Sequence, residues 1–519
     1  MRISKLLALI LALLMLVSAF SACNPDSSNP KDSSTESEEG SSNTESGSTT
    51  ENASESETEK VSILNGVTFE GTVLNILNGS ASEFGEYVEE ITEHSDLIDQ
   101  AVFNRCDYAE TRLKVSTKWT ASTSAANAAA FADEADRENR NGGKYDIIFN
   151  KSTYSAGLMT RGVLSNLMQY NLLDFASDGW AHSMVEDVSV GNKLYFATGD
   201  ISVCLLFMTS VVYFNKDMVK DFSINQKIQT NWGKADLYEL VESGTWTLDK
   251  MITLTEGIYL DTNNSGKKDS GDRVGFNTYA QLIDNFFYGG GYTTVVADDG
   301  SFAVGDAFLE PTLMGNLLEQ VNEFLHDSGN GGVIEESYNP TRLNFAEGKV
   351  LFSMAPASHA YNTHSNADKL DFGVLPVPKH SESQNGYACT QSFPYNMYSI
   401  ASQGKYRREA AAFMQALSEE SYEVTRPAIF DKMMKGRYSE EPEDAMMWNY
   451  AIDSNVFDAG RIFQDLFKDS ISSKNMTVDL FRDKISENNS NWSGVLQSYA
   501  GPLVTAAAGL AGTITALPD

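Results

Sequence analysis

The segment Val73-Leu74-Asn75-Ile76-Leu77 opens the pattern that decides the fold, because it is a short apolar strand followed by helical sequence. The following stretches continue it: a helix over residues 86–111, a strand over 113–119, an Ala-rich helix over 123–139, and the strand Tyr145-Asp146-Ile147-Ile148-Phe149. Alternating strands and helices within about 80 residues are typical of a parallel sheet covered by helices. The sequence therefore predicts an α/β fold.

Further strand and helix patterns extend over the rest of the chain. We expect strands at 211–214, 349–354, 372–378 and 396–401, a hairpin over 293–304 that turns at Asp299-Gly300, and a helix over 406–417. Open α/β sheets bind ligands beyond the carboxyl ends of their strands. Residues 78–84 and 150–154 follow two of the first strands, so they are candidate binding loops.

The N-terminus has the pattern of an export signal. Arg2 and Lys5 precede an apolar run from Leu6 to Val17, which is too short for a comfortable membrane span of about 20 residues. Phe20-Ser21-Ala22-Cys23 resembles a bacterial lipobox, in which the cysteine becomes the lipidated first residue. We expect residues 1–22 to be a lipoprotein signal peptide and Cys23 to carry lipid; plain secretion is the alternative.

Residues 23–60 are expected to form a disordered Ser/Glu-rich tether. After Cys23 they contain no Leu, Ile, Val, Phe, Tyr or Trp, so they cannot bury enough apolar surface to offset the entropy of ordering. The whole chain of 519 residues has a formal net charge of -33, and most of it falls outside the tether. Such a charge opposes binding to nucleic acid or anionic lipid, because both require Lys and Arg.

One loop has the ligand spacing of an EF-hand-type calcium site. The loop runs from Asp261 to Asp272, with Gly266 at the sharp turn. The expected ligands are Asp261, Asn263, Ser265, the backbone oxygen of Lys267, Asp269 and Asp272. Position 12 is Asp where EF-hands usually have Glu, so we expect a modest affinity and a structural role for Ca²⁺. The alternative is a polar loop that merely turns.

Sequence motifs for catalysis are missing. There is no Gly-x-Ser-x-Gly, no His-Glu-x-x-His and no phosphate-binding glycine loop. The chain has so many acidic residues that a pair of carboxylates spaced as in a glycoside hydrolase would not indicate catalysis.

With Cys23 assigned to lipid, Cys106, Cys204 and Cys389 remain, which allows at most one intramolecular disulfide. Their spacing suits no zinc site.

Several motifs, in this order, resemble the extracellular solute-binding proteins of bacterial ABC importers, in the group with sugar- and maltodextrin-binding members. Besides the lipobox, the matching stretches are Val212–Met218, Leu237–Val241, Gly244–Met251, Arg273–Phe276, Phe345–Val350 and Phe372–Lys379. The resemblance covers residues 61–519. It implies a two-lobe periplasmic-binding-protein-like fold, each lobe a mainly parallel sheet flanked by helices, with the ligand in the cleft between them.

By this resemblance, lobe one is 61–200 with 340–377, and lobe two is 201–339 with 378–519. The cleft is expected to be lined by Asn78, Asn150, Tyr154, Asp200, Tyr292, His359 and Tyr361. Asn150 and His359 depart from the maltodextrin-binding pattern, which puts a maltodextrin ligand in doubt.

The resemblance implies a monomeric, non-enzymatic lipoprotein on the outer face of the cell membrane. We expect it to capture a solute, namely a mono- or oligosaccharide, and to deliver it to ABC permease subunits. The alternatives are a surface glycoside hydrolase and a calcium-dependent surface adhesion protein.

Overall fold

The computed structural model describes residues 62–79, 85–92, 95–309, 311–327, 331–362, 370–392, 394–434, 442–471 and 478–518. The chain divides into two units, Met1–Lys60 and Val61–Asp519, and the described residues all belong to the second. The predicted signal peptide, the lipidated Cys23 and the tether therefore lie outside the described residues. A search of the described helices found none with the length and apolar character needed to cross a membrane.

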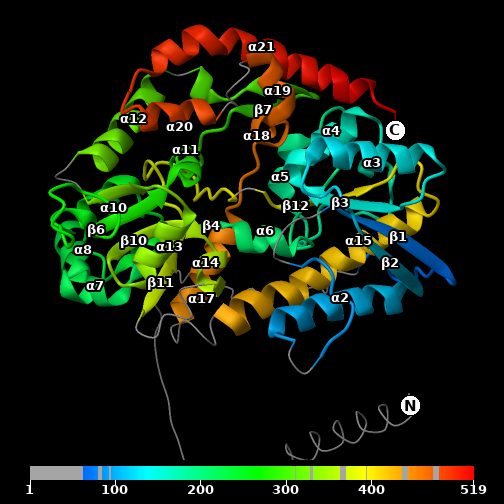
Figure 1. The fold of residues 1–519 in the computed structure, drawn as a ribbon, viewed down its shortest axis with the longest axis horizontal. Helices are drawn as coiled ribbons and strands as arrows, with labels where there is room; N and C mark the ends of the chain where they lie inside the picture. The colour runs from blue at the N-terminus through cyan, green and yellow to red at the C-terminus, as the bar shows by residue number, and fades with distance from the viewer. Residues whose placement is uncertain are drawn as a thin grey trace, which may run out of the picture. The chain divides into compact units, whose positions relative to one another are not determined.

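The first sheet has four strands in the order β12-β3-β1-β2 (Figure 1). Strand β1 (Thr72–Gly79) pairs in parallel with β2 (Val115–Ala121) on one side and β3 (Ile147–Lys151) on the other. Strand β12 (Asn396–Ile400) pairs antiparallel with β3. The three strands predicted from the opening pattern therefore form one parallel sheet, which confirms the α/β prediction.

Helices α2 (Leu97–Leu113), α3 (Ala128–Arg140), α4 (Ser152–Thr160) and α15 (Arg407–Glu420) accompany this sheet. Helix α2 starts about ten residues later than the sequence suggests. The reason is its N-cap: the Asp96 carboxylate accepts hydrogen bonds from the N–H groups of Ile98 and Asp99, both at 2.9 Å.

The second sheet has six strands, in the order β11-β4-β10-β6-β5 with β9 also paired to β6. Its strands are β4 (Ser210–Asn215), β5 (Tyr259–Leu260), β6 (Arg273–Tyr279), β9 (Gly332–Glu335), β10 (Val350–Pro356) and β11 (Phe372–Leu375). Strand β10 is parallel to β6 and antiparallel to β4. Every residue of β4 and β10 is buried, as expected of strands covered on both faces.

The strand pairings correct the expected division into lobes. Residues 340–377 were assigned to lobe one, but β10 and β11 lie in the second sheet, where both pair with β4. Conversely, β12 and α15 were assigned to lobe two, but β12 pairs with β3 and α15 packs against α2. The two-lobe α/β class is unchanged, and the chain returns to the first sheet later than expected. The second sheet is not mainly parallel as expected, because β4 pairs antiparallel with β10 and β11, and β5 pairs antiparallel with β6.

The other helices are distributed around these sheets. Short ones are α5 (His182–Val188), α6 (Val203–Met208), α7 (Lys216–Asp221), α8 (Ile224–Trp232), α9 (Leu237–Glu242), α10 (Leu248–Thr255), α11 (Asp284–Gly289), α13 (Tyr338–Ala346), α14 (Ser358–Asn362), α18 (Ala459–Ile462), α19 (Gln464–Ile471) and α20 (Asp479–Ser486). Longer ones are α12 (Pro311–His326), α17 (Pro442–Asp453) and α21 (Trp492–Ala516). Figure 1 shows α21 as the long red helix that ends near the C-terminus.

Within the described residues, the remaining elements are one hairpin and five short 3₁₀- or π-helical segments. The predicted hairpin is present as β7 (Val295–Asp298) and β8 (Ser301–Val304), with Asp299 and Gly300 at positive φ. The 3₁₀ turns are η1 (Leu167–Gln169), η2 (Ala280–Leu282) and η3 (Asp306–Phe308), and the π-helical turns are η5 (Ser421–Thr425) and η6 (Ala428–Met434).

The chain passes between the two sheets in segments that contact one another, which we call the crossing segments: 199–210, 376–395 and 453–459. Thr209 bridges to Gln391, and Cys389 bridges to Asn455. The Asn455 side chain joins all three segments, because its amide donates to the Thr209 hydroxyl at 2.9 Å and its oxygen accepts from Gln391 at 3.1 Å. Cys106, Cys204 and Cys389 are buried free thiols.

Candidate functional site

A pocket opens at the carboxyl ends of two parallel strands of the second sheet. Strand β6 ends at Tyr279 and its parallel neighbour β10 ends at Pro356, and both residues line a cavity of about 480 Å³. Its full lining is Met208, Tyr279, Tyr338, Arg342, Pro356, Ser358, Asn362 and Ser392. We call it the strand-end pocket. This is the position at which open α/β sheets bind ligands.

Aromatic rings form one wall of the strand-end pocket. The rings of Tyr279 and Tyr338 lie edge to face, 6.1 Å apart, and the Arg342 guanidinium lies 5.5 Å from the Tyr338 ring centre. Burial raises the pKa of Tyr279, so its phenol keeps its proton at neutral pH. The hydroxyls of Ser358 and Ser392 and the amide of Asn362 supply polar groups. Rings with nearby hydroxyls and amides suit a ligand with apolar faces and polar edges.

His359 and Tyr361, two of the predicted cleft residues, lie in α14 beside this pocket without lining it. The His359 ring is fully buried against Tyr338, with ring centres 4.5 Å apart. Burial, assisted by Arg342, lowers the pKa of His359 to about 3, so its imidazole is neutral at pH 7. The Tyr361 hydroxyl donates to the Asp96 carboxylate at 2.8 Å. Both residues support the pocket wall that Ser358 and Asn362 form.

Asn78 and Asn150 lie in strands β1 and β3 of the first sheet, and Tyr154 lies in α4. None of the three lines the strand-end pocket or the crossing pocket described below. The Asn78 carbonyl in β1 accepts a hydrogen bond from the N–H of Ser122 at 2.8 Å. The buried Asn150 amide donates to the Ser155 hydroxyl at 2.9 Å, and the Tyr154 hydroxyl donates to the Ala125 carbonyl at 3.2 Å. The Asn150–Ser155 bond holds the turn from β3 into α4, and the other two contacts tie β1 and α4 to the segment that follows β2. Of the candidate loop 78–84, residues 80–84 lie outside the described residues.

Tyr292 lies elsewhere in the second half of the chain. Its ring packs 6.0 Å from that of Phe287, and its hydroxyl lies 3.4 Å from Nδ1 of His380. Burial raises the pKa of Tyr292. It lines neither pocket, so the structure does not bring it together with the other predicted cleft residues.

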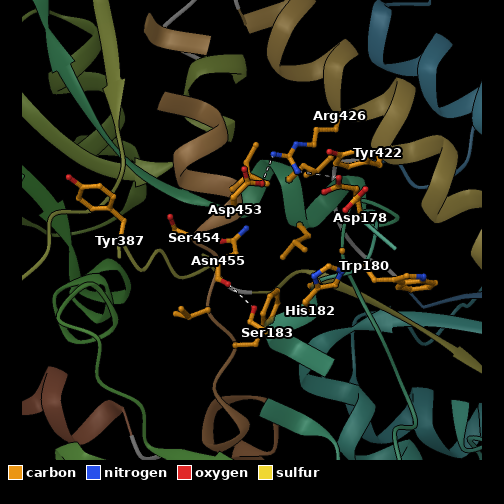
Figure 2. A pocket seen from close by; sticks show the side chains of 18 residues that line it. Asp178, Trp180, His182, Ser183, Tyr387, Tyr422, Arg426, Asp453, Ser454 and Asn455 are labelled. Atoms are coloured by element: carbon orange, nitrogen blue, oxygen red, sulfur yellow. Dashed lines mark hydrogen bonds and ion pairs between the residues drawn. The ribbon is translucent and has the colours of Figure 1, made fainter. Parts of the chain in front are cut away.

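Asp200 lines a second pocket, of about 550 Å³, which we call the crossing pocket because residues from all three crossing segments form it. Its full lining is Asp178, Trp180, Ala181, His182, Ser183, Gly199, Asp200, Leu205, Leu206, Tyr387, Tyr422, Arg426, Ile452, Asp453, Ser454, Asn455, Val456 and Phe457. Figure 2 shows Arg426 reaching Asp453, with Tyr422 and Asp178 nearby and the Asn455 backbone bonded to Ser183.

The predicted calcium loop is closed by its own side chains. The Asp261 carboxylate accepts from the N–H groups of Ser265 at 3.1 Å and Gly266 at 2.8 Å. Asp269 accepts from the Asn263 amide at 2.6 Å and from the Ser265 hydroxyl at 2.8 Å, and that hydroxyl also donates to the Lys267 carbonyl at 3.0 Å.

The remaining acid of this loop, Asp272, is 1% exposed and accepts from the N–H groups of Thr262 and Asp269, both at 3.1 Å. The predicted ligands therefore share one loop and contact one another. Within the described residues, however, no three Asp, Glu, His or Cys side chains are grouped closely enough to hold a metal ion.

None of the eight residues that line the strand-end pocket was among the predicted cleft residues: Met208, Tyr279, Tyr338, Arg342, Pro356, Ser358, Asn362 and Ser392. A signal for some of them was present, because Tyr279 and Pro356 end strands and Ser358 follows one. The candidate loops 78–84 and 150–154 follow strands of the first sheet, and of the predicted residues after β10, His359 and Tyr361, neither lines the pocket.

Comparison with known proteins shows the same fold. No protein-family model matches the chain, and no curated protein matches it. A cyclo/maltodextrin-binding protein, solved in complex with maltotetraose, is similar over 83% of this chain and 96% of its own, with 12% identity and a TM-score of 0.51.

Two further solved structures are similar to the same degree. UspC of M. tuberculosis covers 84% of this chain and 100% of its own, with 13% identity and a TM-score of 0.50. The cyclic α-maltosyl-1,6-maltose binding protein from Arthrobacter globiformis covers 85% and 99%, with 13% identity and a TM-score of 0.50. Because the sequence identities are this low, the structural similarity establishes the two-lobe α/β fold and nothing further.

Proposed function

We propose that this protein is an extracellular substrate-binding lipoprotein that captures a mono- or oligosaccharide and delivers it to the permease of an ABC transporter. The observation that carries the proposal is the strand-end pocket, where two tyrosine rings meet hydroxyl and amide groups at the carboxyl ends of β6 and β10. Tyrosine rings stack on the apolar faces of sugars, and the polar groups take the hydroxyls. Two similar structures of this fold are named for binding maltodextrin-type saccharides.

The mechanism is capture and release, with no bond made or broken. The crossing segments join the two sheets, and small changes in their backbone would let the sheets move together over a ligand and apart again. The hydrogen bond from Tyr361 in α14 to Asp96 at the start of α2 joins elements of the two halves. Because it lies beside the strand-end pocket, it is suited to respond to a bound sugar.

The chemistry of the strand-end pocket disfavours the hydrolase alternative. A glycoside hydrolase ordinarily needs two carboxylic acids flanking the scissile bond. The eight residues that line this pocket include no Asp or Glu. No observation favours the adhesion alternative either, so neither is proposed.

Anchoring and location are part of the same proposal. The lipobox-like Phe20-Ser21-Ala22-Cys23 supports lipidation of Cys23 at the outer face of the cell membrane. The acidic tether of residues 24–60 would hold the binding unit away from anionic lipid, and we propose that this unit acts as a monomer.

Saccharide binding is tested by isothermal titration calorimetry of the mature protein with glucose, galactose, maltose, maltotriose and lactose. We expect at least one saccharide to bind, and Tyr338→Ala to weaken that binding about 10- to 100-fold, since losing the contact of one ring costs about 1.5–3 kcal/mol. Tyr108→Ala, which changes a 40% exposed ring on α2, is the control and should leave the affinity unchanged. Failure of every saccharide, with binding of peptides instead, would contradict the proposal.

We further propose that Ca²⁺ binds the loop Asp261–Asp272 and stabilises it. Five oxygen-bearing side chains at EF-hand spacing support this, although Ca²⁺ would have to replace several of the hydrogen bonds that now close the loop. With a Kd of about 10⁻⁴–10⁻³ M, a tenfold excess of Ca²⁺ should stabilise the fold by about 1.4 kcal/mol.

The measurement is the melting temperature with and without Ca²⁺. Calcium should raise it by about 2 °C in the wild type, and Asp261→Asn should remove most of the increase. Asp217→Asn, a surface acid of α7, is the matched control and should keep it. An equal response to Mg²⁺, or an unchanged response in Asp261→Asn, would argue against the site.

A further inference from the structure

The crossing pocket is a second cavity, separate from the site proposed for saccharide. It shares no lining residue with the strand-end pocket. Its volume of about 550 Å³ falls within the range of about 300–1,000 Å³ typical of small-molecule sites. The proposed saccharide function gives this cavity no role.

The charged groups of the crossing pocket are unbalanced. Three carboxylates, Asp178, Asp200 and Asp453, face one guanidinium, that of Arg426. Arg426 is committed mainly to Asp453, at 2.6 Å, and to the amide oxygen of Asn449, at 3.2 Å. Its contact with Asp200 is longer, at 3.5 Å. The pocket therefore has more carboxylates than guanidinium groups, and the short contact of the Arg426 guanidinium is with the exposed Asp453 rather than with the buried Asp200.

Asp200 is the group that most needs a partner. It is 94% buried, with a relative exposure of 6%, and it lines the pocket. Its Oδ2 has only the long contact with Arg426, and its Oδ1 accepts no hydrogen bond from any residue in the described part of the chain. Burial, opposed by Arg426, raises the pKa of Asp200 to about 6. The only side-chain partner that the described residues give this carboxylate is the distant Arg426, so a cation in the pocket would add a shorter, charge-assisted hydrogen bond.

Aromatic side chains complete the wall. Trp180 and Tyr387 use their own polar atoms within the protein: the indole N–H donates to Gln415 at 3.0 Å, and the Tyr387 hydroxyl donates to the Val241 carbonyl at 2.9 Å. Trp180 is only 3% exposed, and the Lys379 ammonium already lies 5.7 Å from the Tyr387 ring centre. The ring beside the carboxylates of the pocket is therefore that of Tyr422, which lies 5.7 Å from the Arg426 guanidinium. Ring faces near carboxylates attract organic cations.

We propose that the crossing pocket binds a small organic cation with a primary ammonium group, which donates to Asp200 and packs its carbon chain against the aromatic wall. An ammonium group has three donors and no acceptor, which matches an unsatisfied carboxylate oxygen. A bare metal ion fits less well, since no three acidic, His or Cys side chains of the described residues are grouped closely enough to hold one. The proposal is independent of saccharide binding.

The experiment is calorimetric titration of the mature protein, at pH 7.5, with two amines and their matched diols. The amines are putrescine and ethanolamine, and the diols are 1,4-butanediol and ethylene glycol, which have hydroxyls in place of the amines. We expect at least one amine to bind and neither diol to do so. Binding of a diol as tight as that of its amine, or no heat from either amine at millimolar concentration, would overturn the proposal.

Two variants distinguish amine binding in the crossing pocket from nonspecific attraction of amines to the acidic surface. Asp200→Asn should weaken amine binding at least tenfold, whereas Asp217→Asn, on exposed α7, should leave it unchanged. If Asp200→Asn fails to fold, Asp453→Asn serves instead, because that carboxylate is 64% exposed; its replacement removes one partner of Arg426 and lowers the negative charge of the pocket. Equal amine affinity in the wild type and in the pocket variant that folds would show that the amine binds elsewhere.

Discussion

Replacing Glu86 by alanine is expected to lower the free energy of unfolding by about 3–5 kcal/mol, because it leaves a buried arginine without its carboxylate. The Glu86 and Arg105 side chains are both fully buried and form an ion pair at 3.1 Å. The same carboxylate accepts hydrogen bonds from the N–H groups of Val203 at 3.0 Å and Cys204 at 3.1 Å, at the start of α6. One side chain thus fixes the beginning of the first crossing helix.

Urea denaturation of the wild type and of Glu86→Ala measures this loss. The matched control is Glu70→Ala, because Glu70 also pairs with a cation, Lys114 at 2.7 Å, but both side chains are more than half exposed. An exposed pair contributes about 0–1 kcal/mol, so the control should scarcely change the unfolding free energy. Equal losses in the two variants would mean that burial of the Glu86 pair contributes nothing.

The first sheet could be predicted from the sequence because its three parallel strands are neighbours along the chain. Strands β1, β2 and β3 follow one another with a helix between each pair, and such a succession leaves few topologies. The start of α2 was wrong by about ten residues for a related reason. The helical pattern of the sequence extends back to residue 86. In the structure the Glu86 carboxylate instead accepts hydrogen bonds from Arg105 and from the first turn of α6, and the helix begins only after its N-cap, Asp96.

The assignment of β10 and β11 to a lobe could not be predicted from local pattern. Both read as apolar strands, and nothing in 350–356 or 372–375 says which sheet they join. Their partners are set by residues more than 130 positions away in β4, such as Phe214 opposite Phe352. The pairing of β12 with β3 depends on contacts at still longer range, such as Tyr398 opposite Phe149.

The candidate site was missed for the same reason. The rule that open α/β sheets bind ligands at strand ends points to the pocket at Tyr279 and Pro356, but choosing between the two sheets requires knowing that β6 and β10 are parallel neighbours. His359, one of the expected cleft residues, does follow strand β10. Its ring is buried beneath Tyr338, and the adjacent Ser358 lines the pocket instead.

Replacing Asp458 by alanine should lower the free energy of unfolding by about 3–5 kcal/mol, because several buried donors share this one carboxylate. Asp458 is 3% exposed and caps α18, where the last crossing segment ends. It accepts from the N–H groups of Thr294 at 2.9 Å and Gly460 at 2.8 Å, and from the Tyr288 hydroxyl at 3.0 Å. Each unsatisfied donor costs about 1–3 kcal/mol, offset in part by removal of a desolvated charge.

Thermal and urea unfolding of Asp458→Ala and Asp458→Asn test this, with the exposed Asp465→Ala on α19 as a control expected to change stability by less than about 0.5 kcal/mol. Asn keeps one acceptor oxygen, so Asp458→Asn should lower the free energy of unfolding less than Asp458→Ala does.

The pH dependence of stability gives a second readout, since burial raises the pKa of Asp458 above 3.8. The folded state then holds this proton more tightly than the unfolded chain, so its contribution to stability falls as pH rises from 3.8 through the folded pKa. Asp458→Asn lacks that proton and should show a shallower decline over the same range; an unchanged slope would mean that Asp458 titrates normally in the fold.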